Sequence, residues 1–234
     1  ARHKAGIIKP ERPVILSPFL YDEVIRVVKE KAEETASKLI IPDSEKLKLI
    51  KTDLNGTEFL YNGKPFVTGM CGKHQMINAS SAIEALRELG ITEEHIETAL
   101  KNAAVPARME KMKGFIIDGA HNVSGAKAAA ELIKGQKGKK TLIVGMLKSK
   151  DYKGALAALL PVFDLVIAAD FFSPDAVKRE ELIALTKAAG REATAANNAE
   201  ESLKKAYETG ADIKVICGSL YLCGLMRGNL TGNE

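Results

Sequence analysis

Tryptophan is absent from the sequence, and aromatic residues make up only 5% of it. Proteins that bind single-stranded nucleic acid commonly stack bases on aromatic side chains, so this scarcity argues against a base-stacking surface. The 34 basic residues are interleaved with 30 acidic ones, which gives a formal net charge of +4, and the basic run from Lys134 to Lys140 is typical of a solvated loop. We therefore predict no nucleic-acid partner.

Long apolar runs are missing too. None reaches the roughly 20 residues that a membrane-spanning helix needs, and the first residues lack a secretory signal pattern. The three cysteines, Cys71, Cys217 and Cys223, form no C-x-x-C pair. We interpret them as reduced, partly buried thiols. The prediction is a cytoplasmic protein, monomeric and without membrane contact.

Two nucleotide-binding signatures, G-x-x-x-x-G-K-[ST] and G-x-G-x-x-G, do not occur in the sequence. The first is a loop whose backbone N–H groups cradle phosphates, and the second opens a dinucleotide-binding unit. An enzyme that binds a nucleotide on its own is expected to show one of them. The sequence also begins with Ala1 instead of Met, and we interpret it as a piece of a longer protein.

The first part of the sequence mixes helix and strand. An apolar run over residues 12–17 predicts a buried strand. Apolar residues at four-residue spacing then predict an amphipathic helix over residues 21–39. The residues of that face are Val24, Val28, Ala32 and Ala36.

The segment that follows changes to a β pattern and back. Asn-Gly pairs at 55–56 and 62–63 separate short β-prone runs, which indicates an antiparallel meander of three strands over residues 46–69. Helical patterns return over residues 74–89, ended by a glycine, and from residue 92 to about residue 103.

From residue 114 onward the pattern is regular. Strands are predicted at 114–118, 140–146, 163–170, 193–196 and 213–217, and helices at 123–134, 151–160, 178–189, 199–208 and 220–227. Strands that alternate with helices of about ten residues indicate an α/β fold with a doubly wound, mostly parallel sheet. We place the domain boundary near Pro106, which gives domains of residues 1–105 and 106–234.

The stretch from Phe115 to Ala126 reads F-I-I-D-G-A-H-N-V-S-G-A, a predicted strand followed by polar residues and a helix. Ligands of open α/β sheets bind at the carboxyl ends of strands, and a helix N-terminus favours an anion. Asp118, His121 and Asn122 could therefore bind a phosphate, a ribose or a metal-bound water. Alternatively, Asn122 only caps the next helix and Asp118 only ends a strand.

Further polar groups have equally plain alternatives. His74, Gln75 and Asn78 share a helix start, which is either a ligand contact or simply a polar first turn. Other candidates follow predicted strands or lie near the first residue, and each is also explained by a solvated surface or a helix cap. These are Lys148, Lys150, Asp151 and Ser219, and Lys4 with Lys9.

Six stretches occur in the order and at about the spacing of one family. They are K-A-G-I-I-K-P (4–10), G-K-H-Q-M-I-N-A (72–79), A-R-M-E (107–110), D-G-A-H-N (118–122), G-M-L-K-S-K-D (145–151) and G-S-L-Y-L (218–222). Together they resemble the C-terminal portion of folylpolyglutamate synthase/dihydrofolate synthase, in the Mur ligase superfamily. The resemblance covers essentially the whole sequence.

The resemblance implies an ATP-dependent ligation that adds L-glutamate to folate or dihydropteroate through an acyl phosphate, with Mg²⁺. It also implies that the phosphate loop and most magnesium ligands lie upstream of Ala1, in the missing N-terminal part of the same protein. Residues 1–105 would then be the second part of a central ATP-binding domain, and residues 106–234 a Rossmann-like C-terminal domain. On this interpretation the sequence lacks activity by itself.

The resemblance also assigns roles. Lys4 resembles a lysine that is carbamylated and helps to hold magnesium, although His3 stands where relatives often have Glu. Asn78 resembles an amide that contacts adenine. Arg108 resembles an arginine that reaches the ATP phosphates, where positive charge would stabilise the transferring group. Ala107 stands where relatives often have Gly.

The remaining assignments concern the later motifs. Asp118 and His121 resemble a pair that the C-terminal domain brings to the nucleotide. Lys150, Asp151 and Ser219 are assigned to the glutamate side. Two alternatives stay open: a Mur-type ligase that adds an amino acid to a cell-wall precursor, and a non-catalytic binding module that kept the fold. The folate-type motifs over residues 4–10 and 72–79 argue against the first.

Overall fold

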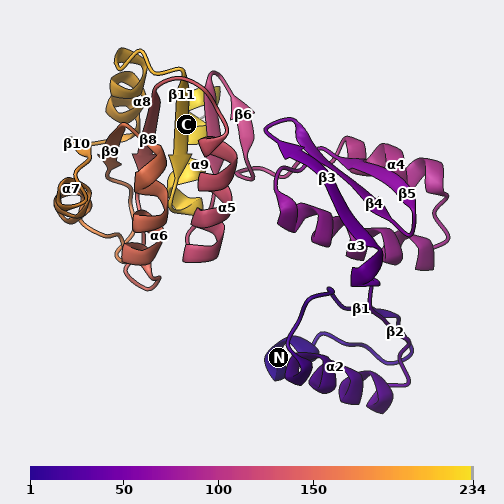
Figure 1. Ribbon diagram of the computed structural model, residues 1–234. Helices are drawn as coiled ribbons and strands as arrows, with labels where there is room; N and C mark the ends of the chain where they lie inside the picture. Colours follow the sequence, from indigo (N-terminus) through magenta and orange to yellow (C-terminus); the bar gives the residue numbers. More distant parts are fainter. Residues whose placement is uncertain (233–234) are drawn as a thin grey trace. The chain divides into compact units, whose positions relative to one another are not determined.

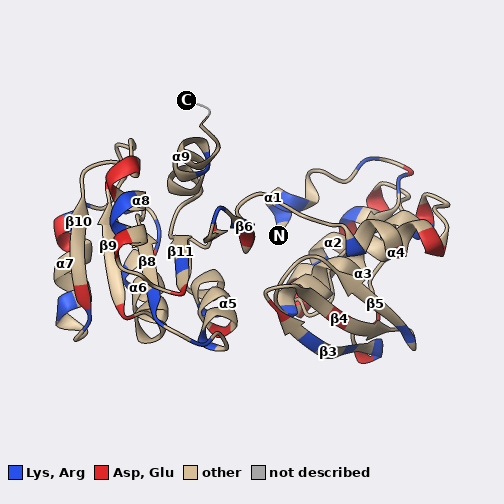
Figure 2. Cartoon of the chain, turned by 90° about the horizontal axis from the view of Figure 1, so that it is seen from above, with Lys and Arg blue, Asp and Glu red and all other residues tan. Residues whose placement is uncertain are grey.

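The computed structural model describes residues 1–232 (Figure 1). Its contacts divide the chain into two compact units, Ala1–Ala103 and Ala104–Glu234. None of the helices in the described range is both long and apolar enough to cross a membrane. Basic and acidic residues are interleaved along the ribbons of both units (Figure 2).

Unit 1 begins with a short helix and a small β-α-β unit: α1 (Arg2–Ala5), β1 (Val14–Ile15), α2 (Asp22–Glu34) and β2 (Leu39–Ile40). The two short strands pair in parallel, so the strand predicted over residues 12–17 is confirmed in a shorter form. The helix predicted to reach residue 39 ends at residue 34. Its last turn is closed by Thr35, whose hydroxyl donates to the Lys31 carbonyl at 2.9 Å. Ala36 is exposed with a φ of +52°, so its assignment to the apolar face was wrong.

The rest of unit 1 is the meander and two helices: a 3-10 turn η1 (Ser44–Lys46), β3 (Leu47–Asp53), β4 (Gly56–Tyr61), β5 (Lys64–Thr68), α3 (Lys73–Glu88) and α4 (Glu93–Lys101). Both pairings of the meander are antiparallel, as predicted. Asn62 and Gly63 have φ values of +52° and +76°, the conformation that a two-residue hairpin turn requires. Side chains from the meander meet those of α3 and α4 in one core: Leu47, Phe59, Tyr61, Phe66, Met76, Ala79, Ile83, Ile96 and Leu100.

Unit 2 is an α/β layer structure, as predicted. Its elements are β6 (Glu110–Met112), β7 (Phe115–Asp118), α5 (Val123–Lys134), β8 (Lys140–Val144), α6 (Tyr152–Leu159), a 3-10 turn η2 (Leu160–Val162), β9 (Leu165–Ala169), α7 (Arg179–Ala188), β10 (Glu192–Ala196), α8 (Ala199–Glu208), β11 (Ile213–Cys217) and α9 (Leu220–Thr231). The six strands lie in the order β10-β9-β8-β11-β7-β6. All neighbours pair in parallel except β6 and β7.

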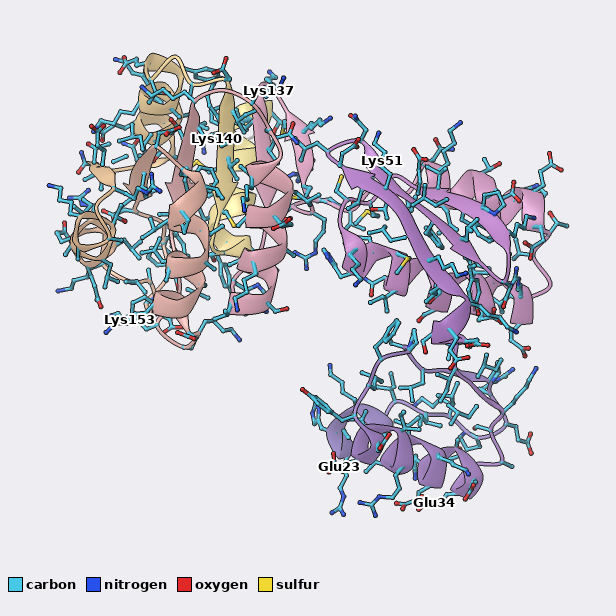
Figure 3. The ribbon with its side chains drawn as sticks, in the orientation of Figure 1. Glu23, Glu34, Lys51, Lys137, Lys140 and Lys153 are labelled. Carbon is cyan, nitrogen blue, oxygen red and sulfur yellow. The ribbon has the colours of Figure 1, made fainter. Side chains whose placement is uncertain are left out.

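The inner strands β7, β8 and β9 are buried almost throughout, which is why they read as continuous apolar runs. Alternate side chains of each strand, such as Ile117, Ile143 and Ile216, join one core cluster with residues of α8 and α9. Helices α5 and α6 pack on each other and lie in front of the sheet in Figure 1, where α9 lies behind it. The basic run after α5 is at the surface: Lys137 is exposed and Lys140 half-buried (Figure 3).

Candidate functional site

Three loops meet at the carboxyl ends of the neighbouring strands β7, β11 and β8. Gly218, after β11, has a φ of +114°, and a Cβ added there would lie 2.7 Å from the carbonyl oxygen of Gly145, after β8. On the other side, the thiol of Cys217 lies 3.6 Å from the carbonyl oxygen of Ala120, after β7. These contacts bring the D-G-A-H-N, G-M-L-K-S-K-D and G-S-L-Y-L motifs to one edge of the sheet.

Asp118 ends β7 and is buried, with 9% of its surface exposed. Its carboxylate oxygens each accept a backbone N–H: Oδ1 from Ala120 and Oδ2 from Met109, both at 2.9 Å. One of these donors lies in its own loop and the other next to Arg108. Asp118 therefore holds two segments of chain together.

The turn that carries Arg108 has an unusual backbone. The residues on either side, Ala107 and Met109, have φ values of +55° and +51°, a region that disfavours residues other than glycine. Their buried N–H groups are both held by carboxylates, Ala107 by Glu110 at 2.9 Å and Met109 by Asp118. Buried donors need such partners. The turn is therefore fixed by its hydrogen bonds in spite of its strained dihedrals.

Gly119 brings the Arg108 side chain against the D-G-A-H-N loop. Its N–H donates to the Ala107 carbonyl at 2.8 Å. A Cβ added at this position would lie 3.0 Å from Nη1 of Arg108 and 2.2 Å from Cδ2 of Leu220. Only glycine leaves room for both side chains, so the loop and the guanidinium pack directly on each other.

His121 and Asn122 end the loop. Nδ1 of His121 lies 2.9 Å from the Gly119 carbonyl oxygen, which can only accept, so Nδ1 carries the proton. Nε2 of the half-buried ring is then the atom left for a ligand. Asn122 accepts the Gly125 N–H at 2.8 Å, so its role as the cap of α5 is confirmed.

A second ion pair supports the Arg108 turn from α9. Arg227 donates to both oxygens of Glu110, at 2.8 and 3.0 Å, and the same carboxylate accepts the Ala107 N–H. Burial acts to raise the pKa of Glu110, but the hydrogen bonds from Arg227 and Ala107 outweigh it and lower that pKa. Sequence patterns did not predict this pair: Glu110 lies inside the A-R-M-E motif, but no motif includes Arg227.

The two cysteines of unit 2 are buried thiols that donate to this loop. Sγ of Cys223 lies 3.4 Å from the Asp118 carbonyl, and Sγ of Cys217 contacts the Ala120 carbonyl. Burial, with Asp118 as the next cause, raises the pKa of Cys223 to about 12 and that of Cys217 well above its ordinary value. All three cysteines are free and buried, and the raised pKa values of Cys217 and Cys223 disfavour their nucleophilic thiolate forms.

The residues assigned to glutamate have local partners. Asp151 caps α6 by accepting the Gly154 N–H at 2.9 Å, and Ser219 caps α9 by accepting the Tyr221 N–H at 3.2 Å. Ser219 is 1% exposed. Lys150 and Asp151 are both exposed, and Ser219 is buried. The pKa of Asp175 is lowered mainly by its hydrogen bond from Ser149, and the positive charges of Lys148 and Lys150 lower it further.

In unit 1, Asn78 lies on the first turns of α3. Its Nδ2 donates to Oε1 of Gln75 at 3.0 Å, and Nε2 of Gln75 lies 3.1 Å from Nε2 of His74. The structure therefore links these three residues of the G-K-H-Q-M-I-N motif by a series of side-chain hydrogen bonds. His74 and Asn78, at the two ends of this series, are exposed.

Lys4 lies in α1 and is exposed. Over residues 1–232, no group of three or more His, Cys, Asp or Glu side chains is placed to hold a metal ion. The ammonium group of unmodified Lys4 cannot serve as a ligand either. The described residues do not fit a magnesium site by themselves, and no reaction step is assigned to that ion.

The sequence profile of the family described as "Dihydrofolate synthetase, C-terminal domain" matches residues 101–228. The chain is 27% identical to a probable dihydrofolate synthetase of Schizosaccharomyces pombe, covering 97% of this chain and 59% of that protein. It is 28% identical to the folylpolyglutamate synthase of Lacticaseibacillus casei, covering 100% of this chain and 58% of that protein.

A solved structure has the same fold over the whole chain. It is the Mycobacterium tuberculosis folylpolyglutamate synthase complexed with ADP and AMPPCP, with a TM-score of 0.82 and 23% identity. The match covers 100% of this chain and 59% of that one. The chain thus spans less than two thirds of the length of these proteins.

Proposed function

The chain belongs to the dihydrofolate synthetase family, and on that premise we propose that it is the C-terminal part of an ATP-dependent ligase that adds L-glutamate to folate or dihydropteroate. The observation that carries the proposal is the joined pair of motifs in unit 2. The Arg108 turn and the D-G-A-H-N loop are bound to each other at the carboxyl edge of a parallel sheet. That edge is where ligands of this fold class bind.

The proposed reaction has two bond-forming steps. A carboxylate oxygen of folate or dihydropteroate attacks the γ-phosphorus of ATP, the bond from that phosphorus to the bridging oxygen breaks, and ADP leaves. The amino nitrogen of L-glutamate then attacks the acyl carbon. An amide forms, the nitrogen loses a proton, and the acyl C–O bond breaks to release inorganic phosphate.

The residues of the chain divide the work with ATP. Arg108 would place its charge on the phosphates, where positive charge stabilises phosphoryl transfer. His121 would offer Nε2 to the nucleotide, and Asp118 would keep the Arg108 turn in place. Asn78 in unit 1 would contact the adenine. The nucleotide complexes of the M. tuberculosis synthase are consistent with an adenosine nucleotide as the ligand.

Other parts of the reaction need residues outside the chain. The sequence has no G-x-x-x-x-G-K-[ST] loop, so we propose that an N-terminal part of the same protein supplies it, with the magnesium ligands. Lys4 would join that site as a carbamate, which offers oxygen to a hard cation. Lys150 would attract the carboxylates of glutamate. Residues 1–105 then belong to the central domain and 106–234 to the C-terminal domain.

Two preparations test the proposal: the 234-residue chain, and the product of its reading frame extended upstream of Ala1. Each is incubated with ATP, Mg²⁺, L-glutamate and either dihydropteroate or folate, and ADP is measured. We expect ADP from the extended product and none from the chain alone, and we expect the extension to encode a G-K-[ST] loop. ADP formed by the chain alone would contradict the division of the site. An extended product that is inactive on both substrates would contradict the function.

A further inference from the structure

The start of α3 is held by the hairpin that precedes it. The N–H of Gly72 donates to the hydroxyl oxygens of Thr52 and Thr57, at 2.8 and 3.1 Å. The N–H of Gln75 then donates to the Gly72 carbonyl at 2.8 Å. These contacts fix the backbone from which Gln75 and Asn78 project, so the positions of both side chains are set by the fold of unit 1.

Gln75 is buried, with 8% of its surface exposed, while its neighbours His74 and Asn78 are exposed. The amide nitrogen of a glutamine can only donate. Nε2 of His74, 3.1 Å from that nitrogen, is therefore the acceptor. This contact turns Oε1 of Gln75 toward Asn78, whose Nδ2 donates to it at 3.0 Å. The carboxamide of Gln75 is thus held at both ends.

The orientation of Asn78 follows from that of Gln75. Because Nδ2 of Asn78 faces Gln75, Oδ1 is on the opposite side of the exposed carboxamide, together with the second N–H of Nδ2. This pattern of an acceptor beside a donor matches N6 and N7 of adenine, the edge that an asparagine reads in two hydrogen bonds. A 6-oxopurine presents an oxygen at the same place and would face Oδ1 with a second acceptor.

We propose that Gln75 is a positioning residue that fixes the carboxamide of Asn78 and thereby makes the site select adenine over 6-oxopurines. The inference rests on the proposed contact between Asn78 and the nucleotide base. It goes further because it assigns base selectivity to a buried side chain that itself does not reach the base.

The test compares ATP with inosine triphosphate, which differs from ATP only at the C6 edge of the purine. The upstream-extended protein, which would supply the phosphate loop, is titrated with each nucleotide, and binding is followed through the side-chain and backbone amide signals of Asn78 in ¹⁵N NMR spectra. Three variants are compared with the wild type. Gln75→Met removes both polar atoms of the side chain at similar size, and Gln75→Glu keeps an acceptor for Asn78. Gln136→Met is the control, because it makes the same Gln-to-Met substitution at a position after the end of α5.

For the wild type we expect ATP to bind about 5 to 10 times more tightly than inosine triphosphate, the effect of one hydrogen bond gained or lost at an exposed group. Gln75→Met should reduce this ratio to within about twofold, because a free carboxamide can turn its N–H toward either purine. Gln75→Glu and Gln136→Met should keep the wild-type ratio. The ratio of the two affinities is informative because a merely structural loss would weaken the binding of ATP and of inosine triphosphate by the same factor.

Two results would overturn the inference without touching the proposed function: an unchanged ratio in folded Gln75→Met, or a lost ratio in Gln75→Glu. If Gln75→Met does not fold, the Glu variant still decides. If neither nucleotide shifts the Asn78 signals of the wild-type extended protein, the proposed nucleotide contact is removed, and the inference with it.

Discussion

The backbone N–H of Met109 donates to Oδ2 of Asp118 at 2.9 Å, and both groups are buried. Through this bond the carboxylate at the end of β7 holds the turn that presents Arg108. The reciprocal contact, from the Gly119 N–H to the Ala107 carbonyl, closes the same pair of segments. Two motifs whose hydrogen-bonded residues are nine and twelve positions apart in sequence are thus one structural element.

Removing the Asp118 carboxylate should loosen this element. Asp118→Ala leaves the N–H groups of Met109 and Ala120 buried without their acceptor, and each such loss costs about 1–3 kcal/mol. We expect the free energy of unfolding of unit 2 to fall by roughly 2–4 kcal/mol and the amide exchange of Met109 to accelerate. Urea denaturation and hydrogen exchange measure both. Asp118→Asn keeps one acceptor, so its stability should lie between those of the wild type and the Ala variant. An Ala variant as stable as the wild type would contradict the role of Asp118 in holding the Arg108 turn.

Replacing Ala107 with glycine should increase the stability of unit 2. A residue other than glycine at a φ of +55° costs about 1–2 kcal/mol, while glycine adds about 0.5–1 kcal/mol of unfolded-state entropy. Ala107→Gly should therefore stabilise unit 2 by about 0.5 kcal/mol in urea denaturation. Ala107→Val, which adds a branched side chain at the same dihedrals, should destabilise it. A destabilised Gly variant would show that the turn is not strained.

Gly119→Ala and Gly224→Ala should change the stability of unit 2 in opposite directions. The first places a methyl group against Leu220 and Arg108, and such overpacking costs about 1–3 kcal/mol. The second adds a methyl group inside α9 where nothing lies within 4 Å, and helix propensity favours it by about 0.5–1 kcal/mol. Melting temperatures of the two variants decide. Gly119→Ala at or above the wild-type value would argue against the packing of Arg108 on the loop.

The Glu110–Arg227 pair should make stability depend on pH in the acid range. The pKa of Glu110 is lower in the folded chain than its ordinary value of 4.5. The contribution of the pair is therefore complete above pH 4.5 and is lost as the pH falls through the folded pKa. At pH 7, Glu110→Gln should lower the free energy of unfolding by about 1–2 kcal/mol. The difference in the free energy of unfolding between the variant and the wild type should be smaller at pH 3 than at pH 7. A difference that does not change with pH would contradict a stabilising role for the charge of Glu110.

The sequence predicted the parts of this fold that depend on local patterns. The strands and helices of unit 2 alternate as predicted because each buries a short apolar run, and Asn122 caps α5 as one of the two interpretations required. The meander followed from its two Asn-Gly pairs. The roles assigned to Lys4, Asn78, Arg108, Asp118 and His121 came from the resemblance and remain predictions.

What the sequence did not predict depends on tertiary contacts. The three-residue strand β6 exists because it pairs with the edge of β7, and it is too short to show a period. Glu110 and Arg227 are 117 positions apart, so no local pattern links them. The turn at Met109, with its positive φ, is stabilised by a hydrogen bond that the Met109 N–H donates to Asp118 in a different motif. For the Glu110–Arg227 pair and for Met109, the partners are too far apart in sequence for a local pattern to link them.

The central claim is tested most directly by glutamate transfer in variants of Arg108. Incorporation of labelled L-glutamate into dihydropteroate or folate is measured with the upstream-extended protein, as wild type, Arg108→Ala and Arg191→Ala. Arg191 is the control because its guanidinium donates to the Pro161 carbonyl, away from the proposed chemistry. We predict a wild-type rate that falls about 100-fold or more in Arg108→Ala, the usual effect of losing a group that stabilises transition-state charge, and a near-normal rate in Arg191→Ala. Absence of transfer by the wild type, or an undiminished rate in Arg108→Ala, would contradict the account.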